Sequence, residues 1–137
     1  MTKKFGKRLY GSLVVAALSV SMVATGAFAA SSSTPTTGYG TLTGAISMNY
    51  NLGDFYLTTN VQKNNDNAYL TGKVEWQNKL GQTTGTGSAV PSQRGATSLF
   101  DFWTFFGGSL PHQAFGTHGV QGGNTHQSAA AFTFTNL

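Results

Sequence analysis

The sequence predicts an all-β fold, a small antiparallel β-sandwich or barrel preceded by a cleaved signal peptide. Three observations predict it. Apolar and polar residues alternate over several short segments, turn-forming residues separate these segments at regular spacing, and residues 30–137 show no helical period with capping residues. Strands with such spacing are typical of sandwiches and barrels. The chain has no recognisable internal repeat.

The first half of the expected domain alternates with a period of two. Apolar residues occupy every second position, and their neighbours are mostly Thr, Ser, Asn or charged residues, which is typical of strands with one buried face. Asn, Asp and Gly gather between the strands, because these residues tolerate positive φ or bond their own backbone in turns. The expected strands are 41–50, 55–61 and 68–77, and the expected turns are 51–54 and 64–67.

The second half is less regular and ends in a hairpin. Residues 83–90 are rich in Thr and Gly and predict a weaker strand that stops at Pro91. A loop over 92–97 follows. The remaining expected strands are 99–106, which two glycines end, and the closing hairpin of 114–120 and 125–135 around the turn 121–124.

The first 29 residues have the three parts of a Sec-type signal peptide. Four basic residues precede an apolar stretch over 9–24, and Ala27 and Ala29 supply the small side chains that signal peptidase requires, so we expect cleavage before Ala30. A retained membrane anchor is the alternative, but Gly, Ser and Thr interrupt the stretch, and a transmembrane helix needs about 20 apolar residues. A lipid anchor would need a cysteine, and the sequence has none. We therefore expect a secreted, extracellular protein.

Removal of the signal peptide changes the charge that matters for function. The whole chain has a formal net charge of +4, but four of its eight basic residues lie in the signal peptide, which leaves four basic against four acidic residues and a net charge of zero. Without clustered Lys or Arg, binding to nucleic acid or anionic lipid through charge is not expected. Secreted domains of this size often depend on disulfides, so a cysteine-free domain must rely on packing.

The mature chain is expected to be one domain with a short tail. Residues 30–38 are interpreted as a flexible polar N-terminus, because this stretch is interrupted by Pro35 and offers nothing apolar to bury. A single β domain then spans 39–137, which is long enough for one hydrophobic core.

We expect no enzymatic activity, because the sequence lacks the motifs of common catalytic sites. It has no cysteine nucleophile, no Gly-x-Ser-x-Gly elbow, no phosphate-binding glycine loop and no His-Glu-x-x-His zinc helix. Catalytic carboxylates must lie within several ångströms of each other, yet Asp54 and Asp66 fall in predicted turns and Glu75 lies beside Lys73 on a polar strand face. We interpret these acids as solubilising and turn-forming residues, and we expect no cofactor.

Three histidines, His112, His118 and His126, lie in the last quarter of the chain and raise the question of a metal site or a pH switch. If the closing hairpin folds symmetrically about residues 122–123, His118 pairs with Gln127 and His126 points to the opposite face, and only a one-residue shift in register would place His118 directly across from His126. No carboxylate is expected beside them as a supporting partner. We therefore expect exposed, ordinary histidines and no metal.

Residues 99–106 contain half of the ten Phe and Trp residues that follow the signal peptide. A strand here would be largely apolar on both faces. One interpretation is a strand buried on both sides, although burying Asp101 without a partner would be costly. The others are an exposed aromatic surface for contact and a segment that self-assembles edge to edge. The candidate contact residues are Phe100, Phe102, Trp103, Phe105 and Phe106.

Trp103 and Asp101 share one face of this expected strand. Because a carboxylate prefers water, we expect Trp103 to be at least partly accessible and to contribute to association more than to folding.

These observations favour a secreted, non-enzymatic extracellular protein that acts by surface contact, through binding or assembly. Its partner would be a protein, a glycan or a lipid surface, or a second copy of the chain. The alternative is a membrane-active, bacteriocin-like antimicrobial protein that inserts residues 99–106, although such proteins usually carry cationic clusters. A hydrolase is a third hypothesis and lacks a motif. The composition is common among secreted proteins of Gram-positive bacteria.

Overall fold

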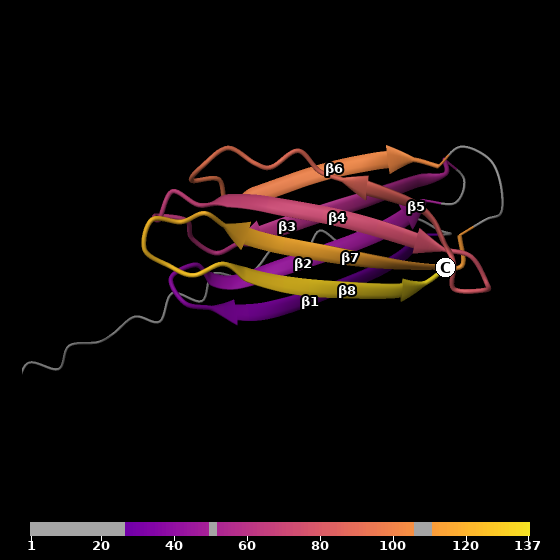
Figure 1. Ribbon diagram of the computed structural model, residues 1–137, viewed down its shortest axis with the longest axis horizontal. Helices are drawn as coiled ribbons and strands as arrows, with labels where there is room; N and C mark the ends of the chain where they lie inside the picture. Colours follow the sequence, from indigo (N-terminus) through magenta and orange to yellow (C-terminus); the bar gives the residue numbers. More distant parts are fainter. Residues whose placement is uncertain (1–26, 50–51, 106–110) are drawn as a thin grey trace, which may run out of the picture.

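The computed structural model describes residues 27–49, 52–105 and 111–137, and in these ranges the chain forms eight β-strands and no helix. The strands pair antiparallel in two four-stranded sheets, which face each other as a sandwich (Figure 1). The all-β prediction is confirmed. The strands are β1 (Ala27–Thr36), β2 (Gly40–Asn49), β3 (Asp54–Val61), β4 (Tyr69–Gln77), β5 (Thr83–Ser88), β6 (Ser98–Thr104), β7 (Gln113–Gln121) and β8 (Ala129–Asn136).

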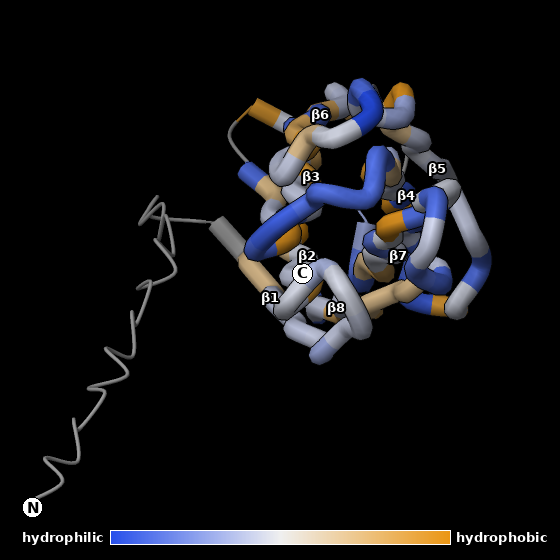
Figure 2. Tube along the Cα trace, turned by 90° about the vertical axis from the view of Figure 1, so that its left-hand side faces the viewer, coloured by the Kyte–Doolittle hydropathy of each residue, from blue (hydrophilic) through white to orange (hydrophobic). Residues whose placement is uncertain are grey.

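We call the two layers sheet A, with strand order β1-β2-β3-β6, and sheet B, with order β5-β4-β7-β8. The chain builds β1, β2 and β3 in succession, crosses to sheet B for β4 and β5, returns to sheet A as β6, and ends in sheet B. Figure 2 shows the two layers end-on, with β1 and β8 together at one seam and β6 and β5 at the other. Strand β6 is therefore an edge strand of sheet A.

The core lies between the sheets and follows from the period-two pattern of the sequence. Every second residue of β2, β3 and β4 is buried, because successive side chains of a strand point to opposite faces. The buried apolar residues form two clusters. One consists of Tyr39, Leu42, Val61, Ala68, Leu70, Ala89, Leu99, Val120 and Ala131. The other consists of Ile46, Met48, Phe55, Leu57, Val74, Trp76 and Ala114.

The N-terminal segment differs from its prediction. Residues 30–36 were expected to be flexible, but they belong to β1, which pairs with β2 at ten positions, from Ala27 opposite Asn49 to Thr36 opposite Gly40. An edge strand is held by backbone hydrogen bonds and needs no buried apolar side chains, and proline is tolerated at a sheet edge. The prediction of a flexible tail was wrong, because backbone pairing with β2 holds these residues without side-chain burial. Most of the expected signal peptide lies outside the described residues.

The closing hairpin has a longer loop than predicted. His118 pairs with Ala131 rather than with Gln127, so the loop between β7 and β8 spans 122–128. The carboxylate of Asp66 holds two backbone amides of this loop. The N–H groups of Thr125 and His126 donate hydrogen bonds to this carboxylate instead of to the facing strand. The backbone pairing of β7 with β8 therefore ends well before the turn.

Candidate contact surface

The aromatic run lies on β6, and the structure divides it between two faces. Phe100 and Phe102 point away from the core and are 56% and 53% exposed. Trp103 and Phe105 point inward and are partly buried. Phe106 lies outside the described residues. Because an edge strand of a two-layer sandwich has one inner and one outer face, the run is neither buried on both faces nor exposed on both.

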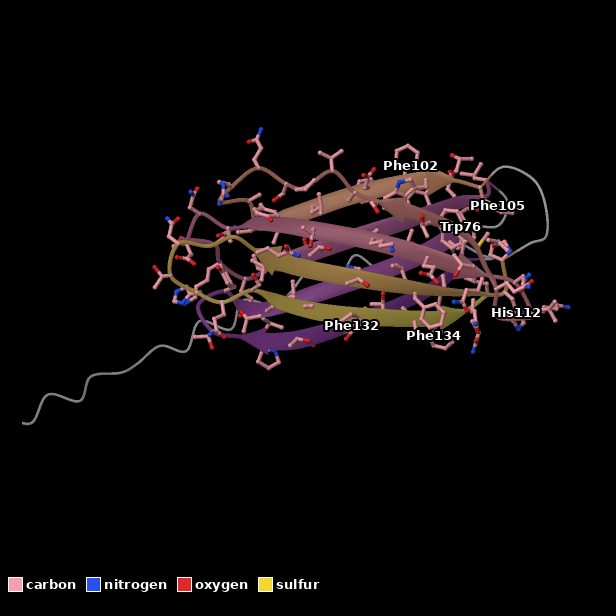
Figure 3. All side chains as sticks on the ribbon, in the orientation of Figure 1. Trp76, Phe102, Phe105, His112, Phe132 and Phe134 are labelled. Carbon is pink, nitrogen blue, oxygen red and sulfur yellow. The ribbon has the colours of Figure 1, made fainter. Side chains whose placement is uncertain are left out.

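Tyr56 joins the two outward phenylalanines in what we call the aromatic patch (Tyr56, Phe100 and Phe102). Tyr56 lies opposite Phe102 across β3 and β6, and their ring centroids are 6.1 Å apart. The other two centroid distances are 6.2 and 6.5 Å, and the ring planes are inclined by 25°, 27° and 30°. Figure 3 shows Phe102 projecting from β6 away from the sandwich. Cross-strand packing thus holds the three rings in one continuous apolar area.

Polar groups border the aromatic patch at the start of β3. The Tyr56 hydroxyl donates to Asp54 Oδ2 at 3.2 Å, and Thr104 Oγ1 donates to Asp54 Oδ1 at 2.7 Å. Burial, with the hydrogen bond to Asp54, raises the pKa of Tyr56, so its phenol stays protonated at neutral pH. Asp54, interpreted from the sequence as a turn residue, therefore fixes the position of one ring of the patch.

The inward-facing tryptophans close the seam between β5 and β6. A Cβ atom at Gly87 would collide with the Trp103 ring, and one at Gly85 would collide with the Trp76 ring. The glycines of β5 therefore leave room for the two indoles, which explains the Thr/Gly-rich composition of this strand. Trp103 packs against both buried clusters. It is partly accessible, but its contacts indicate a role in folding.

Asp101 occupies the free edge of β6. Backbone N–H groups along a strand point alternately to its two sides. Phe105 N–H donates to Gly53 O on the side of β3, so the N–H of Phe102, three residues earlier, points to the free edge. Asp101 Oδ1 accepts this N–H at 2.9 Å. The carboxylate is thus only half-buried and has a partner, and it occupies a donor that another strand would need in order to pair with β6.

A shallow hollow of about 400 Å³ lies on the same outer face of sheet A, over β1 and β2. Its lining offers hydroxyl and amide groups rather than apolar side chains, and at its rim the backbone N–H of Thr41 donates to Gln62 Oε1 at 3.0 Å. We call it the hydroxyl hollow. The lining residues are Ser31, Ser32, Ser33, Thr41, Thr43 and Gln62.

The strands of sheet A contribute no positively charged side chain to its outer face. Strands β1, β2, β3 and β6 contain no Lys, Arg or His, and their acids are Asp54 and Asp101. This face therefore offers no attraction to anionic lipid or nucleic acid. The basic residues of the described chain lie in sheet B or in loops, at Lys63, Lys73, Lys79 and Arg94.

A second exposed aromatic group lies on sheet B and was not singled out from the sequence. Phe115, Phe132 and Phe134 are 39%, 68% and 48% exposed. Phe115 lies opposite Phe134 across β7 and β8, with ring centroids 4.9 Å apart, and Figure 3 shows Phe132 and Phe134 on β8. Their face also carries Lys73 and Glu75 from β4. The signal was present in the alternation of residues 129–136, which were predicted only as part of a strand of the closing hairpin.

The three histidines do not converge. His112 precedes β7 at the end of the sandwich that holds the C-terminus, where its carbonyl accepts the N–H of Leu137 (Figure 3). His126 lies in the β7–β8 loop at the opposite end, with its ring 5.7 Å from that of Tyr39. His118 lies between them, inside the sandwich. In the described part of the chain, no three His, Cys, Asp or Glu side chains are placed to hold a metal ion.

His118 was expected to be exposed, but its side chain is fully buried. Its Nδ1 lies 3.1 Å from Thr59 Oγ1 on sheet A, and its Nε2 lies 3.0 Å from Thr133 Oγ1 on sheet B. Thr59 Oγ1 uses its own hydrogen to donate to Thr71 O, so it accepts from the Nδ1–H of His118. Nε2 then accepts from Thr133. The neutral Nδ1–H tautomer therefore satisfies every polar group in this chain of hydrogen bonds.

Small residues create the space for the buried imidazole. A Cβ atom at Gly44 of β2 or at Gly116 of β7 would come too close to the His118 ring. Burial lowers the pKa of His118 from the ordinary 6.5 to about 4, because the charged form would lose its hydration. His118 is therefore a neutral residue that links the two sheets.

Asp66 is also more than a turn residue. It is 6% exposed and accepts hydrogen bonds from the Tyr39 hydroxyl at 2.9 Å and from the backbone N–H groups of Thr125 and His126 at 2.9 and 2.8 Å. These bonds, with that of His126 the largest influence, lower the pKa of Asp66. One carboxylate thus ties together the β1–β2, β3–β4 and β7–β8 loops.

No protein-family model, curated protein or solved structure matches this chain. Within the described residues, no helix has the length and apolar character to cross a bilayer.

Proposed function

We propose that this chain is a secreted, non-enzymatic protein that acts outside the cell by surface contact, and that the aromatic patch makes the contact. The observation that carries the proposal is the exposure of Phe100 and Phe102, at 56% and 53%, beside Tyr56 on one sheet face. Large apolar side chains are usually buried. Rings held in place by their neighbours offer contact area with little loss of side-chain entropy.

The N-terminal sequence supports export. A cut before Ala30 removes three of the ten residues of β1 and leaves seven, 30–36, paired with β2. Sheet A therefore keeps its fourth strand in the mature protein. N-terminal sequencing of the exported protein tests this step, and a product that retains Lys3 would contradict it.

Adsorption to intact Gram-positive cells tests the contact role of the patch. The double variant Phe100→Ala/Phe102→Ala should lose most of the adsorption shown by the mature protein. The variant Phe132→Ala/Phe134→Ala is the matched control, because it removes two similarly exposed rings from the outer face of sheet B, and it should adsorb like the wild type. Equal adsorption of all three proteins would refute the proposal.

Dye release from anionic vesicles distinguishes the membrane-active alternative. The mature protein should release no dye, because the strands of sheet A have no cluster of Lys or Arg to attract such a surface. Release by the wild type that disappears in the Phe100→Ala/Phe102→Ala variant would replace surface contact with membrane activity.

A further inference from the structure

We infer that the aromatic patch and the hydroxyl hollow together bind a neutral polysaccharide. This inference rests on the proposed surface-contact function and specifies the chemical class of its partner. Three features of the outer face of sheet A support it: the two sites are continuous, their groups match the two kinds of surface on a sugar ring, and the strands contribute no positively charged side chain.

The continuity follows from the strand register. Ser31 of the hollow lies opposite Ala45, Ala45 lies opposite Thr58, and Thr58 lies opposite Phe100 of the patch. These four residues form one row across sheet A. Neighbouring strands are about 4.8 Å apart, so the row spans roughly 14 Å. In this row only the small side chains of Ala45 and Thr58 separate the hollow from the patch, so a ligand can lie across both.

The chemistry of the row fits a chain of pyranose units. A pyranose ring has apolar faces of C–H groups and a rim of hydroxyls. The rings of Phe100 and Phe102 can contact the C–H faces, while the hydroxyls of the hollow and the amide of Gln62 donate to and accept from the rim. A lipid chain would leave the polar half of the row without hydrogen-bond partners, which disfavours it.

The charge of the face selects a neutral chain. Strands β1, β2, β3 and β6 contain no Lys or Arg, whereas recognition of carboxylate, sulfate or phosphate groups generally uses these residues. The carboxylate that borders the patch, Asp54, already accepts hydrogen bonds from Tyr56 and Thr104. An acidic polysaccharide would therefore meet the Asp54 carboxylate and no Lys or Arg side chain of these strands.

The exposed apolar area is too small to hold a second copy of the chain by itself. Phe100 and Phe102 expose 56% and 53% of their surface, which for aromatic side chains of about 200 Å² amounts to roughly 220 Å². A stable interface buries about 800 Å² on each partner. Edge-to-edge pairing of β6 is also opposed, because Asp101 already occupies the N–H of Phe102.

Depletion of the mature protein from solution by insoluble polysaccharides tests the inference. Microcrystalline cellulose, chitin and an insoluble β-1,3-glucan serve as probes, at low and high salt. At least one should deplete the wild type, equally at both salt concentrations because no ion pair is involved. Phe100→Ala/Phe102→Ala should weaken binding about tenfold or more. Thr43→Val, which removes a hydroxyl from the hollow, should weaken binding severalfold, and Phe132→Ala/Phe134→Ala should bind like the wild type.

Each other outcome overturns the inference in an identifiable way. If none of the three polysaccharides depletes the protein, the inference of a polysaccharide partner is refuted. Adsorption to cells that depends on the patch would still support the surface-contact function. The partner would be a lipid if the protein bound phosphatidylcholine vesicles, if Phe100→Ala/Phe102→Ala abolished this binding, and if Thr43→Val left it unchanged. The partner would be a second copy of the chain if the wild type self-associated in sedimentation and the Phe100→Ala/Phe102→Ala variant did not. Equal loss of depletion in the sheet B variant would place the site elsewhere.

Discussion

Lowering the pH from 7 to 5 should weaken the fold through one buried side chain, His118. The folded protein keeps this imidazole neutral, because burial lowers its pKa from 6.5 to about 4. The unfolded chain takes up a proton near pH 6.5. Between these two values the unfolded state binds more protons, so the contribution of His118 to stability is complete above pH 6.5 and is lost as the pH falls toward 4.

The size of the effect follows from the two pKa values. The full difference between 6.5 and about 4 corresponds to about 3 kcal/mol of unfolding free energy. More than half of this free energy should be lost between pH 7 and pH 5, where the expected decrease in unfolding free energy is about 2 kcal/mol. Asp66 and Glu75 contribute little in this window, because their pKa values are lowered from ordinary values of 3.8 and 4.5, which both lie below pH 5.

Denaturant unfolding followed by tryptophan fluorescence at pH 7 and pH 5 measures the loss. The matched control is His118→Gln, whose amide can donate toward Thr59 and accept from Thr133 but does not titrate. The wild type should lose about 2 kcal/mol between the two pH values, and the variant, whatever its starting stability, should lose much less. An equal loss in both proteins, or a His118 ring that titrates near pH 6.5 by NMR, would refute the reasoning.

Three further substitutions test other parts of the structure. Asp66→Ala should lower the midpoint of thermal unfolding by several degrees, because it removes the acceptor shared by three loops; Asp54→Ala, measured in parallel, should lower it less. Asp101→Ala should increase self-association in sedimentation velocity, because it frees the edge of β6, whereas Asp54→Ala makes the same charge change and should not. Trp103→Ala should cost about 2 kcal/mol or more in denaturant melts, and Phe102→Ala less than about 1 kcal/mol; the reverse order would place Trp103 outside the core.

The strands could be predicted where one face of the sequence is apolar. Strands β2, β3 and β4 alternate clearly and appear within a few residues of their expected bounds. Strand β1 could not be found this way, because backbone pairing with β2 holds its polar residues. The length of the last loop was equally inaccessible, since it depends on Asp66, which lies about sixty residues earlier in the chain.

The candidate surface was only partly readable from the sequence. Alternation along β6 separated Phe100 and Phe102 from Trp103, but which face points outward depends on the edge position of β6 in sheet A. The role of Asp101 depends on the same fact. His118 did leave a signal, because it shares a strand face with Ala114 and Val120, which are buried. A histidine on an apolar face with glycines beside it indicates a buried imidazole more often than an exposed one.

Strand β1 is attached to the sandwich mainly by its backbone. None of its residues from 29 to 36 is buried, and of these residues only Ala30 packs against one of the apolar clusters, as a partly buried neighbour. Peeling β1 away therefore exposes little core and should require less free energy than global unfolding, so its amides should exchange hydrogen earlier than those of β3 and β4. The expected cleavage point before Ala30 lies on this strand, so we expect a cut there to leave the rest of the domain folded.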